Sequence, residues 1–142
     1  MARSGAVTLG TLALVVASAC SLGTEAGDKP SSVRVRVEGT SSHQLTLVTA
    51  EDFYDYYDLA TDRHIAVAAA SDTTLITLPY DQTLDISRTG SVYVELRNVS
   101  VDSATVRFRV ELNNGQRYDR TATLADSSAL VYYYVYTEYS YW

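Results

Sequence analysis

An alternation of apolar and polar residues with a period of two constrains the fold of this chain more than any other feature. Residues 104–112 read ATVRFRVEL, in which every second residue is apolar and most residues between them are charged. Residues 33–38, VRVRVE, repeat the pattern. Successive side chains of a β-strand point to opposite faces, so each segment predicts a strand with one buried and one solvated face.

The same reasoning predicts further strands along the chain, whereas no stretch beyond the first twenty residues has helical periodicity for more than about one turn. Short, regularly spaced strands of this kind are typical of a sandwich. We therefore expect residues 33–142 to form an all-β domain, an antiparallel Ig-like β-sandwich of about 7–9 strands. The predicted strands include 33–37 (ended by Gly39), 43–49, 65–70, 74–78, 83–86, 91–96 and 104–112, and a C-terminal strand follows.

The sequence NNG at 113–115 predicts a hairpin turn and its register. A two-residue loop would bring Leu124 into phase with the charged face of the hairpin. A three-residue loop, with Gly115 in the left-handed position of a β-bulge, sets Val110 opposite Tyr118 and keeps the apolar face continuous. We expect the three-residue loop.

Residues 1–19 have the features of a secretory signal peptide. Arg3 and the amino terminus supply a positive start, and residues 6–19 form a weakly polar to apolar run that ends in small residues. This run of 14 residues is shorter than the ~20 residues that a membrane-spanning helix needs. We expect the segment to be cleaved.

Cys20 is the only cysteine and directly follows the small residues Ala17-Ser18-Ala19. The segment resembles a lipobox, in which small residues precede the cysteine that is acylated in bacterial lipoproteins, although Ala17 stands where leucine is usual. Ordinary signal peptidase could also cleave after Ala19, which would leave a secreted protein with a free thiol. An unpaired cysteine otherwise lacks a role in an exported protein, so we expect lipidation at Cys20.

Residues 20–32 are predicted to form the lipidated cysteine and a flexible tether of small and polar residues. Each buried CH₂ of an acyl chain contributes about 0.8 kcal/mol, so several chains hold a protein to a membrane without a transmembrane helix. Ser21 follows the cysteine, and the sorting habit of the lipoproteins that this segment resembles then favours the outer membrane over the inner one. We expect a lipid-anchored protein of the bacterial cell envelope, in contact with the periplasm.

Composition excludes several classes of protein. A single cysteine rules out an intramolecular disulfide framework and a Cys-rich zinc site. The formal net charge is −6 and the arginines are scattered, whereas nucleic-acid binding needs a clustered basic surface. His43 and His64 stand in no motif, and no phosphate loop, metal-ligand set or serine elbow appears. We expect no catalytic residue, no metal, no cofactor and no enzyme activity.

The segment 51–58, EDFYDYYD, combines four carboxylates with four aromatic residues. Its oxygen atoms could hold Ca²⁺ weakly, but the ligand spacing and glycine of an EF-hand are absent. The alternative is a solvated hairpin tip or a one-turn helix whose aromatic residues lie on the edge of the sandwich. We favour this second interpretation.

The C-terminal segment 129–142, ALVYYYVYTEYSYW, holds half of the twelve tyrosines. The β-branched residues Val131 and Val135 predict that the odd positions face the core, which would leave the even tyrosines as a ladder on the outer face. Such a ladder either stabilises the sheet through aromatic pairs of ~0.2–1 kcal/mol each or forms a platform for a sugar ring, a peptidoglycan strand or a protein. The last aromatic residues are expected to pack on the domain or on a partner. The candidate binding residues are Tyr132, Tyr134, Tyr136, Tyr139, Tyr141 and Trp142.

Several short phrases occur in an order that resembles one family of proteins. They are VEG at 37–39, TLPY at 77–80 leading into TLDI at 83–86, and VYVELRN at 92–98, followed by the alternating strand and its Asn-Gly turn. The order is similar to the exported sandwich domains of the mycobacterial membrane protein small family and of similar short bacterial lipoproteins, over roughly residues 33–135. The family commonly has Leu-Pro-Trp at the Leu78-Pro79-Tyr80 position and lacks the acidic, Tyr-rich insertion.

The resemblance implies a sandwich fold and a role as an accessory to lipid exporters, although the mycobacterial members are anchored by a helix rather than by a lipobox. From the residues themselves we predict a non-enzymatic, membrane-anchored envelope lipoprotein that acts as a binding or accessory module through its aromatic C-terminal strand. Two alternatives are an accessory subunit of an envelope lipid transport system and a self-assembling structural subunit. In the latter, the apolar C-terminal strand would pair edge to edge.

Overall fold

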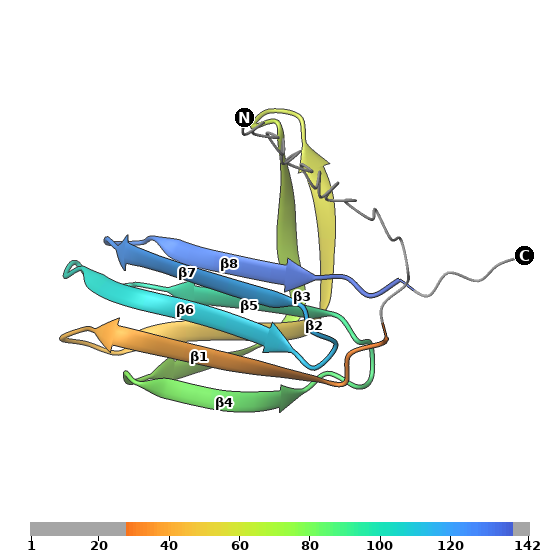
Figure 1. Ribbon diagram of the computed structural model, residues 1–142. Helices are drawn as coiled ribbons and strands as arrows, with labels where there is room; N and C mark the ends of the chain where they lie inside the picture. The colour runs from red at the N-terminus through yellow and green to blue at the C-terminus, as the bar shows by residue number, and fades with distance from the viewer. Residues whose placement is uncertain (1–27, 138–142) are drawn as a thin grey trace, which may run out of the picture.

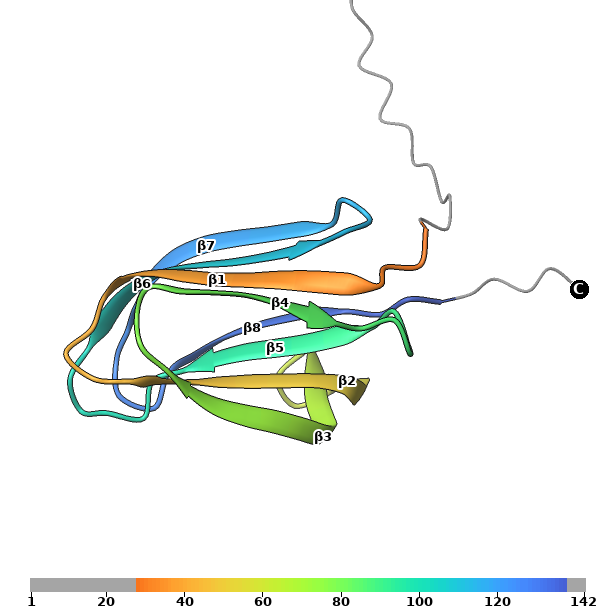
Figure 2. The same ribbon diagram turned by 90° about the horizontal axis from the view of Figure 1, so that it is seen from below.

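The computed structural model describes residues 28–137, which form eight strands and no helix. The strands lie in two antiparallel sheets of four that pack face to face (Figures 1 and 2). The predicted all-β sandwich is thereby confirmed. The strands are β1 (Ser32–Thr40), β2 (Leu45–Asp58), β3 (Arg63–Ile76), β4 (Tyr80–Asp85), β5 (Val92–Arg97), β6 (Ala104–Leu112), β7 (Arg117–Leu124) and β8 (Ala129–Tyr134).

The strand order differs from that of an immunoglobulin domain. Sheet A has the order β4-β1-β6-β7 and sheet B the order β3-β2-β5-β8. The first strand therefore pairs with the fourth and sixth, whereas in the immunoglobulin fold it pairs with the second. The likeness to that fold extends to the two-sheet architecture and not to the strand order.

The alternating segments form the centre of the core. Val35 of β1 lies opposite Val110 of β6, and Val37 lies opposite Phe108. All four side chains are fully buried, because sheet B covers the inner face of sheet A. The residues between them point outward, where the outer face of sheet A carries ion pairs such as Arg107 with Asp119. Both faces of these strands are as the alternation predicts.

The hairpin between β6 and β7 has the predicted three-residue loop. Val110 pairs with Tyr118, and Gly115 has a φ of 94°, which is the left-handed region that favours glycine. The amide of Gly115 donates to the carbonyl of Leu112 at 3.0 Å. Leu124 is consequently buried at the far end of β7.

Gly39 does not end the first strand, as its sequence context suggested, but lies inside it opposite Val106. Its φ is +134°, and a Cβ atom built on it would lie 2.0 Å from the carbonyl oxygen of Thr105. Only glycine fits where the two backbones approach this closely.

The end of the predicted tether lies against the sandwich. Pro30 is buried, and the amides of Ser31 and Ser32 both donate to Oδ1 of Asn113, at 2.9 and 3.2 Å. Residues 28–32 are thus docked beside the β6–β7 loop. Within residues 28–137 there is no helix long and apolar enough to cross a membrane. Cys20 and the predicted signal peptide lie outside the described residues.

The second and third strands differ most from the sequence-based expectation. The segments 65–70 and 74–78 were expected to form two strands, but residues 63–76 form the single strand β3. Its partner β2 runs through the acidic and aromatic segment 51–58 as a strand, so the one-turn helix is wrong. The segment belongs to a hairpin, as predicted, but the tip of that hairpin is residues 59–62 rather than the segment itself. Both strands are 14 residues long, whereas the other strands of the sandwich have six to nine residues.

Candidate functional site: an aromatic arm

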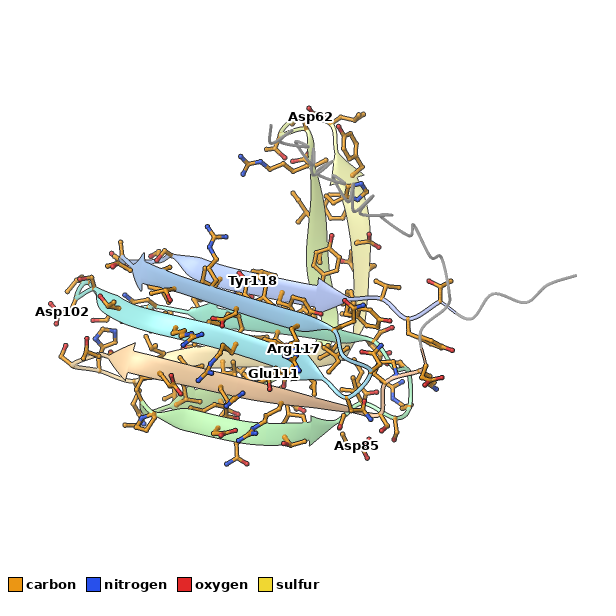
Figure 3. The ribbon with its side chains drawn as sticks, in the orientation of Figure 1. Asp62, Asp85, Asp102, Glu111, Arg117 and Tyr118 are labelled. Carbon is orange, nitrogen blue, oxygen red and sulfur yellow. The ribbon has the colours of Figure 1, made fainter. Side chains whose placement is uncertain are left out.

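The outer halves of β2 and β3 form a two-stranded projection, residues 53–68, which we call the arm. It leaves the line of the other strands and crosses the outer face of sheet B, running past β5 and β8 (Figures 1 and 2). Its tip, marked by Asp62, extends beyond β8 (Figure 3). The arm is the largest departure from a plain sandwich among the described residues.

Irregular pairing at the base of the arm accompanies its change of direction. The register between β2 and β3 shifts between Thr49 and Asp52 and again between Asp52 and Phe53, and bulges of this kind bend a hairpin. The loop after β4 holds the bend from one side. Arg88 donates to Asp52 at 2.8 Å, and the backbone amide of Thr89 donates to Glu51 at 3.2 Å.

The base of the arm packs on sheet B through aromatic contacts. The ring of Phe53 lies 6.1 Å from that of Tyr93 on β5 and 6.0 Å from that of Tyr133 on β8. Ala66 and Ala68 pack against the same small apolar cluster, which includes Val48. These contacts form a second, minor core on the outer face of sheet B, and they attach one face of the arm to the sandwich.

The tip of the arm is closed by side-chain hydrogen bonds. Oδ1 of Asp58 accepts the amide of Ala60 at 3.0 Å, and Oδ2 accepts the hydroxyl of Thr61 at 2.7 Å. These bonds, that from Thr61 first, hold the pKa of Asp58 below its usual value. The hydroxyl of Tyr57 donates to Asp62, whose φ of 54° is left-handed, so two aspartates shape the turn.

The other face of the arm has no contact with the core clusters. Tyr54 lies opposite Val67, and Tyr56 lies opposite Ile65. Tyr54 and Tyr56 are 57% and 47% exposed. Together these four side chains form what we call the tyrosine face of the arm. A two-stranded hairpin is marginally stable in water by itself, so an aromatic face left open in this way is suited to contact another molecule.

A cavity of about 460 Å³ lies in the corner between the arm and sheet B. Its floor includes Glu95, which is only 8% exposed. The hydroxyl of Tyr93 donates to Glu95 at 2.8 Å, and Arg97 donates twice to the same carboxylate, at 2.9 and 2.7 Å. Burial, followed by the bond to Glu95, raises the pKa of Tyr93 well above its usual value. Ala66, Val67 and Ala68 line the side formed by the arm.

The C-terminal strand presents the opposite face to the one that its valines predicted. Leu130, Tyr132 and Tyr134 pair with Leu96, Val94 and Val92 of β5, all of which point into the core. The even positions of β8 therefore face inward, and Val131 is 41% exposed. The preference of β-branched residues for the interior is weak, whereas register against a buried strand is decisive.

The predicted outer ladder of tyrosines is therefore wrong for the residues that β8 contains. The ring of Tyr132 packs at a tilt against that of Tyr118 of β7, with 5.3 Å between ring centroids, and burial raises the pKa of Tyr132 to about 12. Tyr134 packs against the main core. Tyr136 follows the strand, and its amide donates to Ser91 at 2.9 Å. Tyr139, Tyr141 and Trp142 lie outside the described residues.

Three of the four carboxylates of the segment 51–58 accept hydrogen bonds from other parts of the protein. Glu51 and Asp52 bind the β4–β5 loop, and Asp58 shapes the tip. Among residues 28–137 no three His, Cys, Asp or Glu side chains come together as a metal would require. A signal in the sequence could have identified the tyrosine face. Tyr54 and Tyr56 are two residues apart, and so are Ile65 and Val67 on the other side of the turn, so each pair lies on one face of its strand.

A scan of protein-family models, a search of curated proteins and a search of solved structures each found no significant match to this chain. The resemblance to the mycobacterial family accordingly rests on the short sequence phrases alone.

Proposed function

We propose that the protein is a non-enzymatic lipoprotein of the bacterial cell envelope, anchored through Cys20, whose sandwich carries a binding module. The signal-like segment and the single cysteine support the anchor. The binding surface is the tyrosine face of the arm. The C-terminal strand is not the binding surface, because its Tyr132 and Tyr134 pack against the core. Its partner is a glycan strand or another envelope protein.

One observation carries this proposal: the arm holds aromatic side chains away from the sandwich. Tyr54 and Tyr56 belong to neither core cluster, and both are about half exposed. Leu59 at the tip of the arm is 87% exposed. Tyrosine offers rigid apolar area with a polar end, which suits it to stack on a sugar ring or to fill a protein interface.

Replacing both tyrosines with serine tests the binding surface. The Tyr54→Ser/Tyr56→Ser protein should fold but lose retention on purified peptidoglycan and lose its cross-links to envelope proteins. Leu75→Ser is the matched control, because Leu75 is also 60% exposed but lies on the sandwich part of β3. Unchanged retention and unchanged cross-links in the double variant would refute the tyrosine face as the binding surface.

Replacing Cys20 with alanine tests the anchor separately. Acylation of this cysteine is the only attachment that the proposal invokes, so the Cys20→Ala protein should move from the membrane fraction to the soluble fraction. Membrane association that persists in this variant would contradict the anchor and leave the question of the tyrosine face intact.

A further inference from the structure

The distal part of the arm overhangs the edge of sheet B. Phe53 lies over β5 and β8, because its ring contacts Tyr93 and Tyr133. Five more residues lead from Phe53 to Asp58 at the tip, and at ~3.3 Å per residue they span roughly 16 Å. Neighbouring strands are only ~4.8 Å apart. The first part of this span crosses β8 itself, which is the last strand of sheet B. The remainder is long enough to cover about two further strands.

The strand beneath the overhang has an edge that is open to pairing. The other two short edge strands carry charges, with Asp81 and Asp85 on β4 and Asp119 among those on β7. Charged side chains are a common device against pairing between edges. β8 reads ALVYYY and carries no charge, so nothing in its side chains opposes the addition of another strand.

We propose that a second copy of the chain pairs antiparallel with β8, so that the arm of each copy lies over the outer face of the other copy's sheet B. The two-fold axis runs perpendicular to the sheets. Rotation about such an axis makes the two β8 strands antiparallel and keeps the side chains that face the core on the same side of the joined sheet. The result is a closed dimer with a continuous eight-stranded sheet.

The residues of β8 are complementary to themselves in this arrangement. With Tyr132 at the axis, Leu130 lies opposite the partner's Tyr134 on the inner face, and Val131 lies opposite the partner's Tyr133 on the outer face. Pairs of an aromatic and an aliphatic residue stabilise antiparallel strands, and no like charges meet. Val131, which is 41% exposed in one copy, becomes covered.

The same symmetry brings each arm to the corner cavity of the other copy. Val131 pairs with Glu95 on β5, so an arm that continues past β8 reaches the partner's Val131 and then the partner's Glu95. The cavity of about 460 Å³ beside Glu95 is lined on one side by Ala66, Val67 and Ala68. The edge of β3 therefore faces the incoming arm, and Tyr54 and Tyr56 on β2, which do not line this cavity, remain available to a different partner.

The dimer is independent of the anchor and of the partner proposed above, although it is compatible with both. An axis perpendicular to the sheets leaves the two Asp28 residues, where the described part of each copy begins, at the same height on the dimer, which is compatible with attachment of both copies to one membrane.

The test uses the full chain with Cys20→Ala, which removes the anchor, in sedimentation equilibrium over a wide concentration range. The chain should show a monomer–dimer equilibrium. Val131→Asp places a charge at the edge, and Leu59→Asp places one on the overhanging tip. Each should raise the dissociation constant at least about tenfold, which corresponds to about 1.4 kcal/mol. Val101→Asp is the control, because Val101 is 84% exposed in the β5–β6 loop, and it should leave the equilibrium unchanged.

Both test residues are exposed, so their variants should keep the circular dichroism spectrum of the parent. In the same background, Val131→Cys should give a cross-linked dimer with a short bismaleimide, and Val101→Cys should not. A monomer at every concentration would overturn the proposal. Open-ended oligomers, or dimers that resist both Val131→Asp and Leu59→Asp, would also overturn it.

Discussion

The two tyrosine-rich segments of this protein, β8 and the arm, have similar sequences but different environments. Each places several tyrosines within a few residues of one strand, so that some rings lie on either face. In β8 the rings of Tyr132 and Tyr134 pack into the sandwich, whereas in the arm Tyr54 and Tyr56 face away from it. The difference lies in what packs against the tyrosines. Sheet A covers the face of β8 that carries Tyr132 and Tyr134, whereas nothing within residues 28–137 covers the face of the arm that carries Tyr54 and Tyr56. Alternation reports that a strand has two faces, and the neighbouring layer decides which face is buried.

The largest expected effect concerns the buried side of this comparison. Tyr132→Ser removes a ring that packs against Tyr118, with 5.3 Å between ring centroids, and leaves a cavity between the sheets. We expect the free energy of unfolding to fall by about 2–3 kcal/mol. Tyr54→Ser should cost less than about 1 kcal/mol, because its ring is lost only from a cross-strand pair. Urea denaturation of both variants measures the difference, and equal costs would contradict the assigned environments.

Alkaline pH provides a second way to distinguish the buried ring. Burial raises the pKa of Tyr132 from 10.0 to about 12. Between these pH values the unfolded chain loses a proton that the folded chain retains, so stability falls as the pH rises. In Tyr132→Phe this contribution is absent, and stability should fall less steeply between about pH 10 and about pH 12. Urea midpoints measured across this range test the point, and identical slopes would show that Tyr132 is not the group responsible.

Phe53→Ala tests what attaches the arm to the sandwich. The ring makes two aromatic pairs, with Tyr93 and Tyr133, so we expect a loss of about 1–2 kcal/mol. Because the arm is a hairpin with few other contacts, its amides should exchange with deuterium faster while those of β6 change little. Uniform acceleration throughout the sandwich would instead mean that the arm and the main core unfold as one unit.

The smallest effect is expected on the solvated face of sheet A. The hydrogen bond from Arg107 holds the pKa of Asp119 below its usual value, and the two side chains are 49% and 45% exposed. Their contribution is present above the ordinary carboxyl pKa and is lost as the pH falls through the lower folded value. Solvent screening keeps it small. Thermal unfolding of Asp119→Asn should therefore differ slightly from the parent near neutral pH and converge with it in acid, and a constant difference would refute the assignment.

Much of the sandwich could be predicted from local sequence. The strand 104–112 has the bounds that its alternation indicates, and the register of Val110 with Tyr118 follows from the position of Gly115. Local rules were sufficient here because the turn alone sets the pairing of a hairpin. They were insufficient for β3, because the segments 65–70 and 74–78 belong to one strand whose continuity depends on its partner β2.

The candidate site was predictable only in part. The segment 51–58 was recognisable as unusual, and a hairpin was the favoured interpretation, but its direction across β5 and β8 depends on the bulges near Asp52 and on Arg88 from a distant loop. For the C-terminal tyrosines, the intrinsic preference of Val131 for the interior was outweighed by the pairing of Leu130 with Leu96. Contacts of this kind join residues far apart in the chain, so neither segment contains the information by itself.

The sequence by itself determined that this domain is made of strands, where most of them lie and how one hairpin is paired, because side-chain alternation and turn chemistry act within a few residues. Only the tertiary structure decided which tyrosines are buried and which are presented on the arm. Burial depends on the layer that packs against a strand, and that layer comes from distant parts of the chain.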